Sequence, residues 1–178
     1  QTASVEIGHR NSTQTSSVEI TPEDTGITLH VTLDLSDEDS AWVDIVAGIN
    51  HIDELVRNGY PLPAANQIEI HPWLQRLDLR QANEEIGAIT MGYSPLARGH
   101  RVTDPALVSI AQSIGCTPAQ AAIKWVYDTG SITIPKSSNP ERIIENKESL
   151  NIDISNFIED FSLLEESYIS GWNPTIEP

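Results

Sequence analysis

The sequence SITIPKSSNPERIIEN, residues 131–146, combines the signals that decide the fold and point to a ligand. Its β-branched start predicts a short strand, and Asn139–Pro140 predicts a turn that opens a helix. Lys136 and Arg142 flank that helix start, with two serines between them. The chain has 26 acidic and only 10 basic residues. Two cations and two hydroxyls around a helix N-terminus with free N–H groups therefore predict a bound anion, and a phosphate fits best.

Strand-like and helical patterns alternate upstream of this stretch, from about residue 43 onward. Proline follows a capping residue at Asp104 and again at Thr117, which is a usual start of a helix. We expect strands at residues 66–72, 88–95 and 131–136, and helices at residues 51–59, 74–87, 104–115 and 117–130. Strands that alternate with helices of this length predict βα units and a parallel sheet.

The predicted strands end on polar and aromatic side chains. These groups are Gln67 to His71, Tyr93 to Leu96, and Lys136 to Ser138. Functional groups of parallel α/β folds gather where the strands end. We therefore expect the site at this edge of the sheet, although the last group also fits an ordinary helix cap with surface charges.

Residues 1–42 differ from the rest of the chain and are interpreted as a β-rich N-terminal segment. They are rich in Ser and Thr, and residues 26–35 (GITLHVTLDL) alternate apolar with polar side chains. That period of two predicts a half-buried strand. Residues 36–46 begin like a helix at Ser36 and end with β-branched residues, so their structure stays open. Residues 43–178 form the second predicted domain.

Composition excludes several classes of protein and site. The formal charge of -16 argues against a nucleic-acid surface, which needs clustered Lys and Arg. Because no run of about 18 apolar residues exists, we expect no membrane span. Cys116 is the one cysteine, which excludes an intramolecular disulfide. His, Asp and Glu are not grouped at metal-ligand spacings, so no metal site is predicted. A cytoplasmic protein is the default expectation.

Four motifs resemble the aldo-keto reductase family in order and spacing. They are PAANQIEIHPWLQ (63–75), GYSPLARG (92–99), the long stretch at 104–146 and GWNPT (171–175). The resemblance covers roughly residues 43–178. It implies the C-terminal half of a (β/α)8 barrel, whose complete form takes roughly 250 residues.

The resemblance implies NADP(H) as the cofactor and assigns ten residues to it. Lys136, Ser137 and Arg142 would hold the adenosine 2′-phosphate, and Glu145 and Asn146 would contact the adenine. Tyr93 would stack on the nicotinamide, Ser94 and Leu96 would line the pyrophosphate, and Asn50 and Gln67 would hold the carboxamide. The anion expected at residues 131–146 is then the extra phosphate of a dinucleotide.

The catalytic tetrad of that family is absent from the sequence. The family uses a tyrosine acid with a lysine, an aspartate and a histidine from the first half of the barrel. Residues 1–50 contain no tyrosine and no lysine, and His30 lies in a strand that does not match. His71 at a strand end is the one candidate for a catalytic role, and Trp73 beside it is expected to border a pocket. Core or surface roles are expected for the other aromatic and thiol candidates, Tyr60, Tyr127, Tyr168 and Cys116.

Four βα units cannot close a barrel, so strand edges and an apolar inner face need a cover. The N-terminal β-rich segment is one such cover, and a second copy of the chain is another. We expect a homodimer or another form of self-association.

Three functions follow from these features. The first is an NADP(H)-dependent oxidoreductase of carbonyl compounds and alcohols, with a small-molecule carbonyl substrate. The second is a dinucleotide-binding or structural module without catalysis. The third is non-redox chemistry, such as cyclisation or isomerisation, in the same pocket.

Overall fold

The computed structural model describes residues 3–9, 12–18, 44–45, 48–60, 62–171 and 173. It divides the chain into two compact units, residues 1–41 and 42–178. In the first unit, β1 (Ala3–His9) and β2 (Ser12–Val18) pair antiparallel. The strand expected at residues 26–35, and most of the segment left open at residues 36–46, lie outside the described residues.

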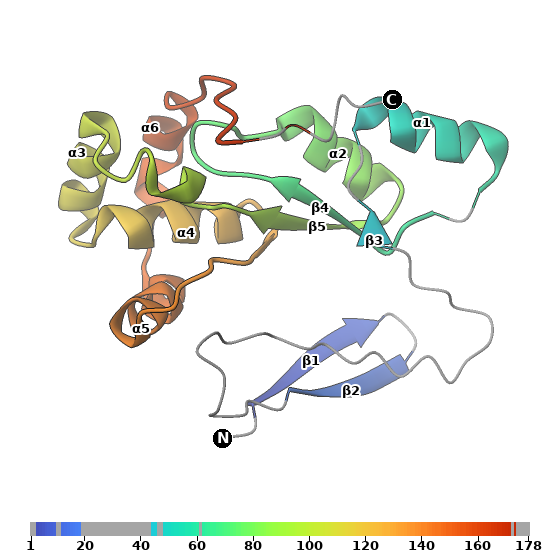
Figure 1. Ribbon diagram of the computed structural model, residues 1–178, viewed down its shortest axis with the longest axis horizontal. Helices are drawn as coiled ribbons and strands as arrows, with labels where there is room; N and C mark the ends of the chain where they lie inside the picture. The colour runs from blue at the N-terminus through green and yellow to red at the C-terminus, as the bar shows by residue number, and fades with distance from the viewer. Residues whose placement is uncertain are drawn as a thin grey trace. The chain divides into compact units, whose positions relative to one another are not determined.

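The second unit contains a parallel sheet whose strand order follows the chain (Figure 1). Its strands are β3 (Asp44–Ile45), β4 (Ala65–Glu69), β5 (Ile89–Tyr93) and β6 (Ile132–Thr133). The helices are α1 (Ile49–Asn58), α2 (Leu77–Glu85), α3 (Pro105–Ile114), α4 (Pro118–Asp128), α5 (Pro140–Glu148) and α6 (Ile158–Ser162). Short 3₁₀ helices lie at η1 (Ala97–Gly99), η2 (Ser149–Asn151) and η3 (Ser155–Phe157). The parallel α/β arrangement expected from the sequence is confirmed.

The helix ends follow the capping chemistry of the sequence. Asp104 Oδ1 accepts a hydrogen bond from the N–H of Ala106 at 2.9 Å, so α3 begins where predicted. The helix expected from residue 74 instead begins at Leu77. Leu74 exchanges two backbone hydrogen bonds with His71, and Arg76 has a left-handed backbone with φ 50°, so neither residue can continue a helix backward.

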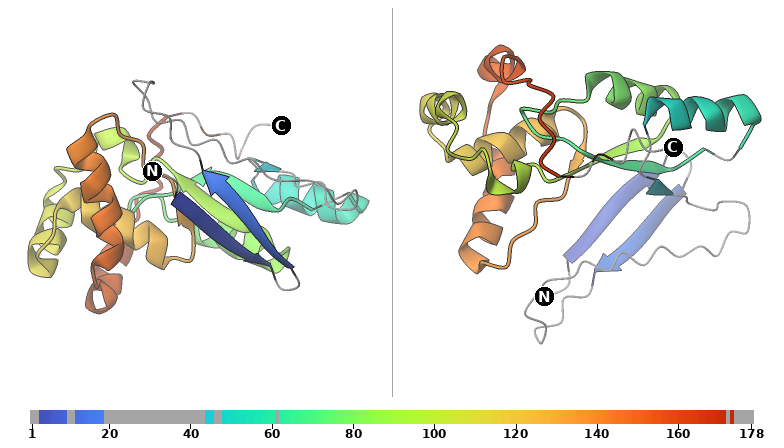
Figure 2. Two further views of the ribbon diagram at one scale, coloured as in Figure 1. Left: turned by 90° about the horizontal axis from the view of Figure 1, so that it is seen from below. Right: turned by 45° about the horizontal axis from the view of Figure 1, so that its top comes forward.

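Helices α2 and α4 cover the same face of the sheet. Asn83 on α2 accepts a hydrogen bond from Asn66 of β4 and donates one to Thr90 of β5, both at 2.9 Å. On α4, Val126 lies so near β5 that a Cβ on Gly92 would come within 3.0 Å of its Cγ1. Both views in Figure 2 show α3 to α6 gathered at one side of this unit, with α1 extending at the other.

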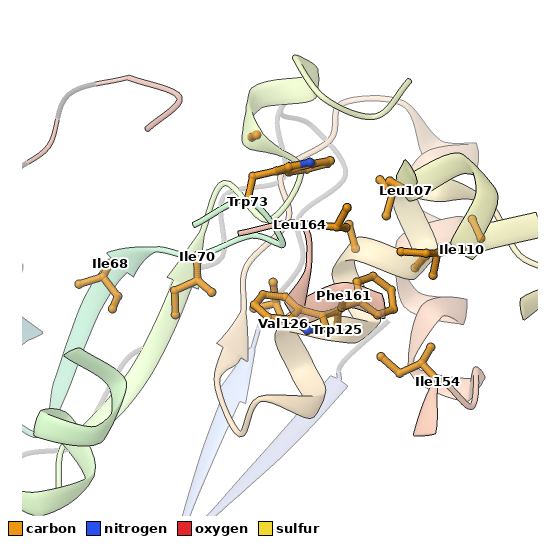
Figure 3. Packing of buried hydrophobic residues seen from close by; sticks show 14 of the residues in the cluster. Ile68, Ile70, Trp73, Leu107, Ile110, Trp125, Val126, Ile154, Phe161 and Leu164 are labelled. Carbon is orange, nitrogen blue, oxygen red and sulfur yellow. The ribbon is translucent and has the colours of Figure 1, made fainter. Parts of the chain in front are cut away.

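The core joins the sheet to the C-terminal helices. Figure 3 shows Ile70, in the loop after β4, beside a group of helical side chains that includes Val126, with Ile68 of β4 next to Ile70. The rings of Trp125 and Phe161 stack with centroids 6.3 Å apart, which ties α6 to α4. Trp73 is fully buried in this core, so the expectation that it borders a pocket is wrong.

No single helix within residues 48–60 and 62–171 has the length and apolarity to cross a membrane. Helices α3 and α4 meet that test only as a pair, and the pair is bent by 83° at its break.

Candidate functional site

The carboxyl ends of β4 and β5 bring three side chains to one face: Gln67 and Tyr93, which are predicted to bind the cofactor, and the charged Glu69. Glu69 is the register partner of Tyr93, and Gln67 lies two residues before Glu69 on β4. Side chains in register on neighbouring strands face the same side of the sheet, as do residues two apart. Gln67 and Tyr93 are both half-buried there. This face lies opposite the one that α2 and α4 cover.

Tyr93 is in a charged neighbourhood. Burial raises the pKa of its hydroxyl above the ordinary value of 10.0, and the carboxylate of Glu69 raises this pKa further. The cations of Arg76 and Arg98 act in the opposite direction. Charges from three segments therefore converge on the tyrosine that ends β5.

The loop after β5 has an unusual backbone. Ser94, Ala97 and Arg98 all have left-handed conformations, with φ of 51°, 47° and 55°. Such a conformation costs a non-glycine residue about 1–2 kcal/mol, and strained residues of this kind cluster at functional sites. Leu96, which lies between them, is half-buried. The loop expected to line the pyrophosphate therefore carries local strain.

His71 is wholly buried beside Glu69. Its Nε2 lies 3.3 Å from Glu69 Oε1, and both side chains are almost fully shielded from solvent. The ring lies between Trp73 and Tyr168, with centroids 5.8 Å and 6.0 Å away. Burial would raise the pKa of Glu69, but hydrogen bonds from His71 and Ser170 outweigh it and hold that pKa below 4.5. The burial of His71 favours a structural role over contact with a substrate.

The predicted phosphate corner is a continuous turn between β6 and α5. Lys136 and Arg142 are exposed and Ser137 is half-buried, with its Oγ accepting a hydrogen bond from Asn139 N–H at 3.1 Å. Asn139 Oδ1 accepts from the N–H groups of Glu141 and Arg142, at 2.8 and 3.2 Å. The expectation of free N–H groups is therefore wrong for these two, because the asparagine caps the helix.

Glu145 and Asn146, which the resemblance assigns to the adenine, lie one turn later on α5. Glu145 Oε1 accepts a hydrogen bond from the Thr117 hydroxyl at 2.6 Å, and its backbone oxygen accepts one from Gln120 Nε2 at 3.3 Å. Asn146 is half-buried beside it. The N-terminus of α4 thus fixes Glu145, a link that sequence reasoning missed.

Asn50 is the one candidate on α1. It is exposed on the first turn of α1, and it lines a shallow hollow of that helix with Asp53, Glu54 and Arg57. Within the described part of the chain, no hydrogen bond joins it to Gln67. Their shared role toward a carboxamide stays a prediction.

A further hollow lies at the opposite end of the sheet. It measures about 660 Å³, and the amino ends of β5 and β6 contribute Ile89 and Ser131 to its lining. Arg80 lines it too, but its guanidinium donates to the carbonyls of Gln75 and Thr129 at 2.9 and 3.2 Å and so ties α2 to the end of α4. Sites of parallel α/β folds lie at the carboxyl ends of strands, so we assign this hollow no function.

Across the described ranges, no cluster of three or more His, Cys, Asp or Glu side chains has the arrangement to hold a metal ion. Cys116 is half-buried, and burial raises the pKa of its thiol. A thiol with a raised pKa is a poor nucleophile.

Comparison with known sequences gives a consistent family match. The profile of the Aldo/keto reductase family matches residues 46–169. An aldo-keto reductase of Mycolicibacterium smegmatis is 41% identical over 105 residues, which cover 59% of this chain and 38% of that protein. An uncharacterized oxidoreductase of Caenorhabditis elegans is 38% identical over 107 residues, which cover 60% of this chain and 33% of that protein. The chain spans less than half the length of these curated relatives.

Solved structures give the same result for the fold. The apo form of Gox0644 aligns with a TM-score of 0.67 and 28% identity, covering 75% of this chain and 50% of that chain. A mutant of Gox0644 in complex with NADPH aligns with a TM-score of 0.63 and 30% identity, covering 68% of this chain and 45% of that chain.

Proposed function

The chain belongs to the aldo/keto reductase family, as its motifs predict, and from this we propose that it binds NADP(H). We further propose that it acts as an NADP(H)-dependent oxidoreductase of carbonyl compounds and alcohols. The similarity to a structure solved with NADPH supports the choice of cofactor. Such a cofactor supplies the hydride, and the protein supplies binding, orientation and electrostatics.

The corner between β6 and α5 carries this proposal. Lys136 and Arg142 are exposed cations that form no ion pair within the described residues, in a chain where acidic residues outnumber basic ones by 26 to 10. A phosphate would give both a partner, and a guanidinium grips phosphate oxygens in pairs. The Ser137 hydroxyl, which donates to the Asn139 carbonyl at 3.4 Å, is the third polar group of this corner. We assign these three residues to the adenosine 2′-phosphate.

Contacts within the protein fix the residues on the adenine side. Thr117 holds the carboxylate of Glu145 at 2.6 Å, and Asn146 follows on the same helix. A fixed acceptor costs less conformational entropy when it meets an adenine amino group than a mobile one does. We assign Glu145 and Asn146 to the adenine ring.

The nicotinamide end is assigned to the edge formed by β4 and β5. Tyr93 presents a half-buried ring at the end of β5, and the strained loop after it contains Ser94 and Leu96. We assign Tyr93 to stacking on the nicotinamide, and Ser94 and Leu96 to the pyrophosphate. Gln67, on the same face as Tyr93, is assigned to the carboxamide together with Asn50.

We propose that residues 43–178 correspond to the C-terminal half of the (β/α)8 barrel, preceded by a separate β-rich segment. Four parallel strands in chain order and a structural match over half of Gox0644 support this correspondence. The division of the chain at residue 41 is consistent with it.

Dinucleotide binding without redox turnover is the second candidate function. The observation that favours it is the absence of tyrosine and lysine from residues 1–50, where the resemblance would place the proton donor and its partner. His71 is enclosed by Trp73 and Tyr168, which favours a structural part over that of a proton donor. Binding and turnover therefore need separate tests.

Titration with NADPH, followed by tryptophan fluorescence, tests the binding proposal. We expect saturable binding, and Arg142→Ala should weaken it by about tenfold to a hundredfold, because one charged hydrogen-bond partner is lost. Arg57→Ala, which removes an exposed arginine of α1, is the matched control and should leave the affinity unchanged. Equal affinities of the wild type and Arg142→Ala would refute the phosphate assignment.

Turnover is tested by mixing the protein, NADPH and a panel of aldehydes and following the nicotinamide absorbance. Substrate-dependent loss of NADPH would support the oxidoreductase. Saturable NADPH binding without any such loss would support the binding module instead.

A further inference from the structure

A carboxylate is buried at the end of β4, and its partners come from the far end of the chain. Glu69 is 2% exposed, and its Oε1 accepts hydrogen bonds from the backbone N–H of Ser170, at 3.1 Å, and from the Ser170 hydroxyl. His71 Nε2 lies 3.3 Å from the same oxygen. A charge this deeply buried is tolerated only when donors surround it. Ser170 thus supplies donors from 101 residues further along the chain.

Ser170 belongs to residues 165–171, which we call the C-terminal segment. The loop after β4 holds the rest of this segment. The carbonyl of Trp73 accepts hydrogen bonds from the N–H groups of Glu166 and Tyr168, at 3.2 and 3.0 Å. The N–H of Gln75 donates to the Glu165 carboxylate at 2.5 Å. In Figure 1 the red C-terminal segment runs beside this loop. Main-chain groups therefore fix its path.

The loop after β5 touches the C-terminal segment through exposed charges. Arg101 pairs with Glu166 at 2.7 Å, and its guanidinium lies 4.4 Å from the ring centroid of Tyr168. His100 Nδ1 lies 3.2 Å from the Tyr168 hydroxyl. Surface ion pairs of this kind contribute little, because water and salt screen them. The buried contact of Glu69 with Ser170 is the stronger anchor.

We propose that Glu69 is a positioning residue whose carboxylate holds the C-terminal segment across the ends of β4 and β5. There the segment closes the nicotinamide end of the cofactor site. This second part rests on the proposed function, because Tyr93, the register partner of Glu69, is the residue assigned to the nicotinamide. The influence of Glu69 on the pKa of Tyr93 agrees with this proximity.

Hydrogen–deuterium exchange tests the first part. Amide protection reports local opening. The amide of Ser170 donates to Glu69, and the amides of Glu166 and Tyr168 donate to the carbonyl of Trp73, so all three report on the C-terminal segment. Glu69→Gln, which removes the charge, and Ser170→Ala, which removes the hydroxyl, should each speed their exchange at least tenfold and leave α4 unchanged. Ser170→Thr keeps both donors and should restore protection. Glu159→Gln, an exposed carboxylate on α6, is the control and should change nothing.

Exchange within twofold of the wild type in both Glu69→Gln and Ser170→Ala would overturn the positioning role. Because Ser170 is only half-buried, Ser170→Ala keeps the test valid if Glu69→Gln does not fold.

Two probes of different length test the second part. Glu69→Gln and Ser170→Ala should weaken NADPH binding at least fivefold and leave the affinity for adenosine 2′,5′-bisphosphate unchanged, since that fragment lacks the nicotinamide. Equal losses for both probes would contradict closure of the nicotinamide end. If the wild type binds neither probe, the proposed function fails, and the exchange experiment still decides whether Glu69 holds the segment.

Discussion

Asn83 is the residue that joins α2 to the sheet by polar contacts. It is fully buried and bridges Asn66 and Thr90 with two hydrogen bonds of 2.9 Å. A buried polar group that loses its partner costs about 1–3 kcal/mol. Asn83→Ala should therefore lower the free energy of unfolding by about 2 kcal/mol, measured as a lower urea midpoint with an unchanged slope.

Gln81→Ala on the exposed side of the same helix is the control for Asn83. It should stay within about 0.5 kcal/mol of the wild type, as surface substitutions usually do. If both variants unfold at the same urea concentration, the buried bridge contributes nothing.

Glu69 gives stability a defined dependence on pH. Its pKa in the folded chain lies below the ordinary 4.5, because the effect of burial is outweighed by the interactions with His71 and Ser170. A carboxyl group whose pKa is lowered by folding stabilises the fold at pH values above its ordinary pKa. This stabilisation is lost as the pH falls through the pKa of the folded state. The wild type should lose more stability than Glu69→Gln between neutral pH and the acidic range below 4.5. Parallel stability curves for the two proteins would rule this out.

Individual residues were predictable where the contact is local. The order of Lys136, Ser137 and Arg142 around a helix start can be predicted from the sequence because all three lie on one short segment. The contact of Glu69 with Ser170 was not predictable, since nothing local marks two residues 101 apart as neighbours. Trp73 was misjudged for a similar reason, because packing against distant helices buries it.

At the scale of elements, Thr117 joins two helices. Its hydroxyl accepts a hydrogen bond from the N–H of Gln120 at 3.1 Å, which caps α4, and donates to Glu145 of α5. Thr117→Ala removes both bonds and should lower the free energy of unfolding by about 1–2 kcal/mol. Thr117→Ser keeps the hydroxyl and should unfold near the wild-type urea midpoint. Equal losses in the two variants would show that the methyl group, and not the hydroxyl, matters here.

The helices were largely predictable because capping residues mark their ends. Asp104, Thr117 and Asn139 each precede a proline, and each caps a helix in the structure. The start of α2 was not predictable. Its sequence from Leu74 to Arg76 carries no breaker, and a backbone pairing of Leu74 with His71 decides the boundary.

At the scale of the whole molecule, the described sheet ends in two edge strands. β3 and β6 each have one neighbour in that sheet, and Ile132 on β6 is 42% exposed. Tyr127 and Leu150 line a hollow with Ile132, so an apolar surface borders this edge. Exposed apolar edge strands favour pairing with another chain.

We therefore predict self-association, with a homodimer as its simplest form. Light scattering should give twice the mass of one chain, and Ile132→Lys should lower that mass because a charge at the edge opposes pairing. A wild-type protein that scatters as a monomer at all concentrations would contradict this prediction.

The central claim is that the turn from Lys136 to Arg142 receives the 2′-phosphate of a dinucleotide. Calorimetric titration of the wild type with NADPH and, separately, with NADH tests it most directly, since the two cofactors differ only in that phosphate. We predict that NADPH binds at least about tenfold more tightly, because each charge-assisted hydrogen bond to the phosphate contributes about 1.5–3 kcal/mol. Equal affinity for the two cofactors, or no binding of either, would contradict the account.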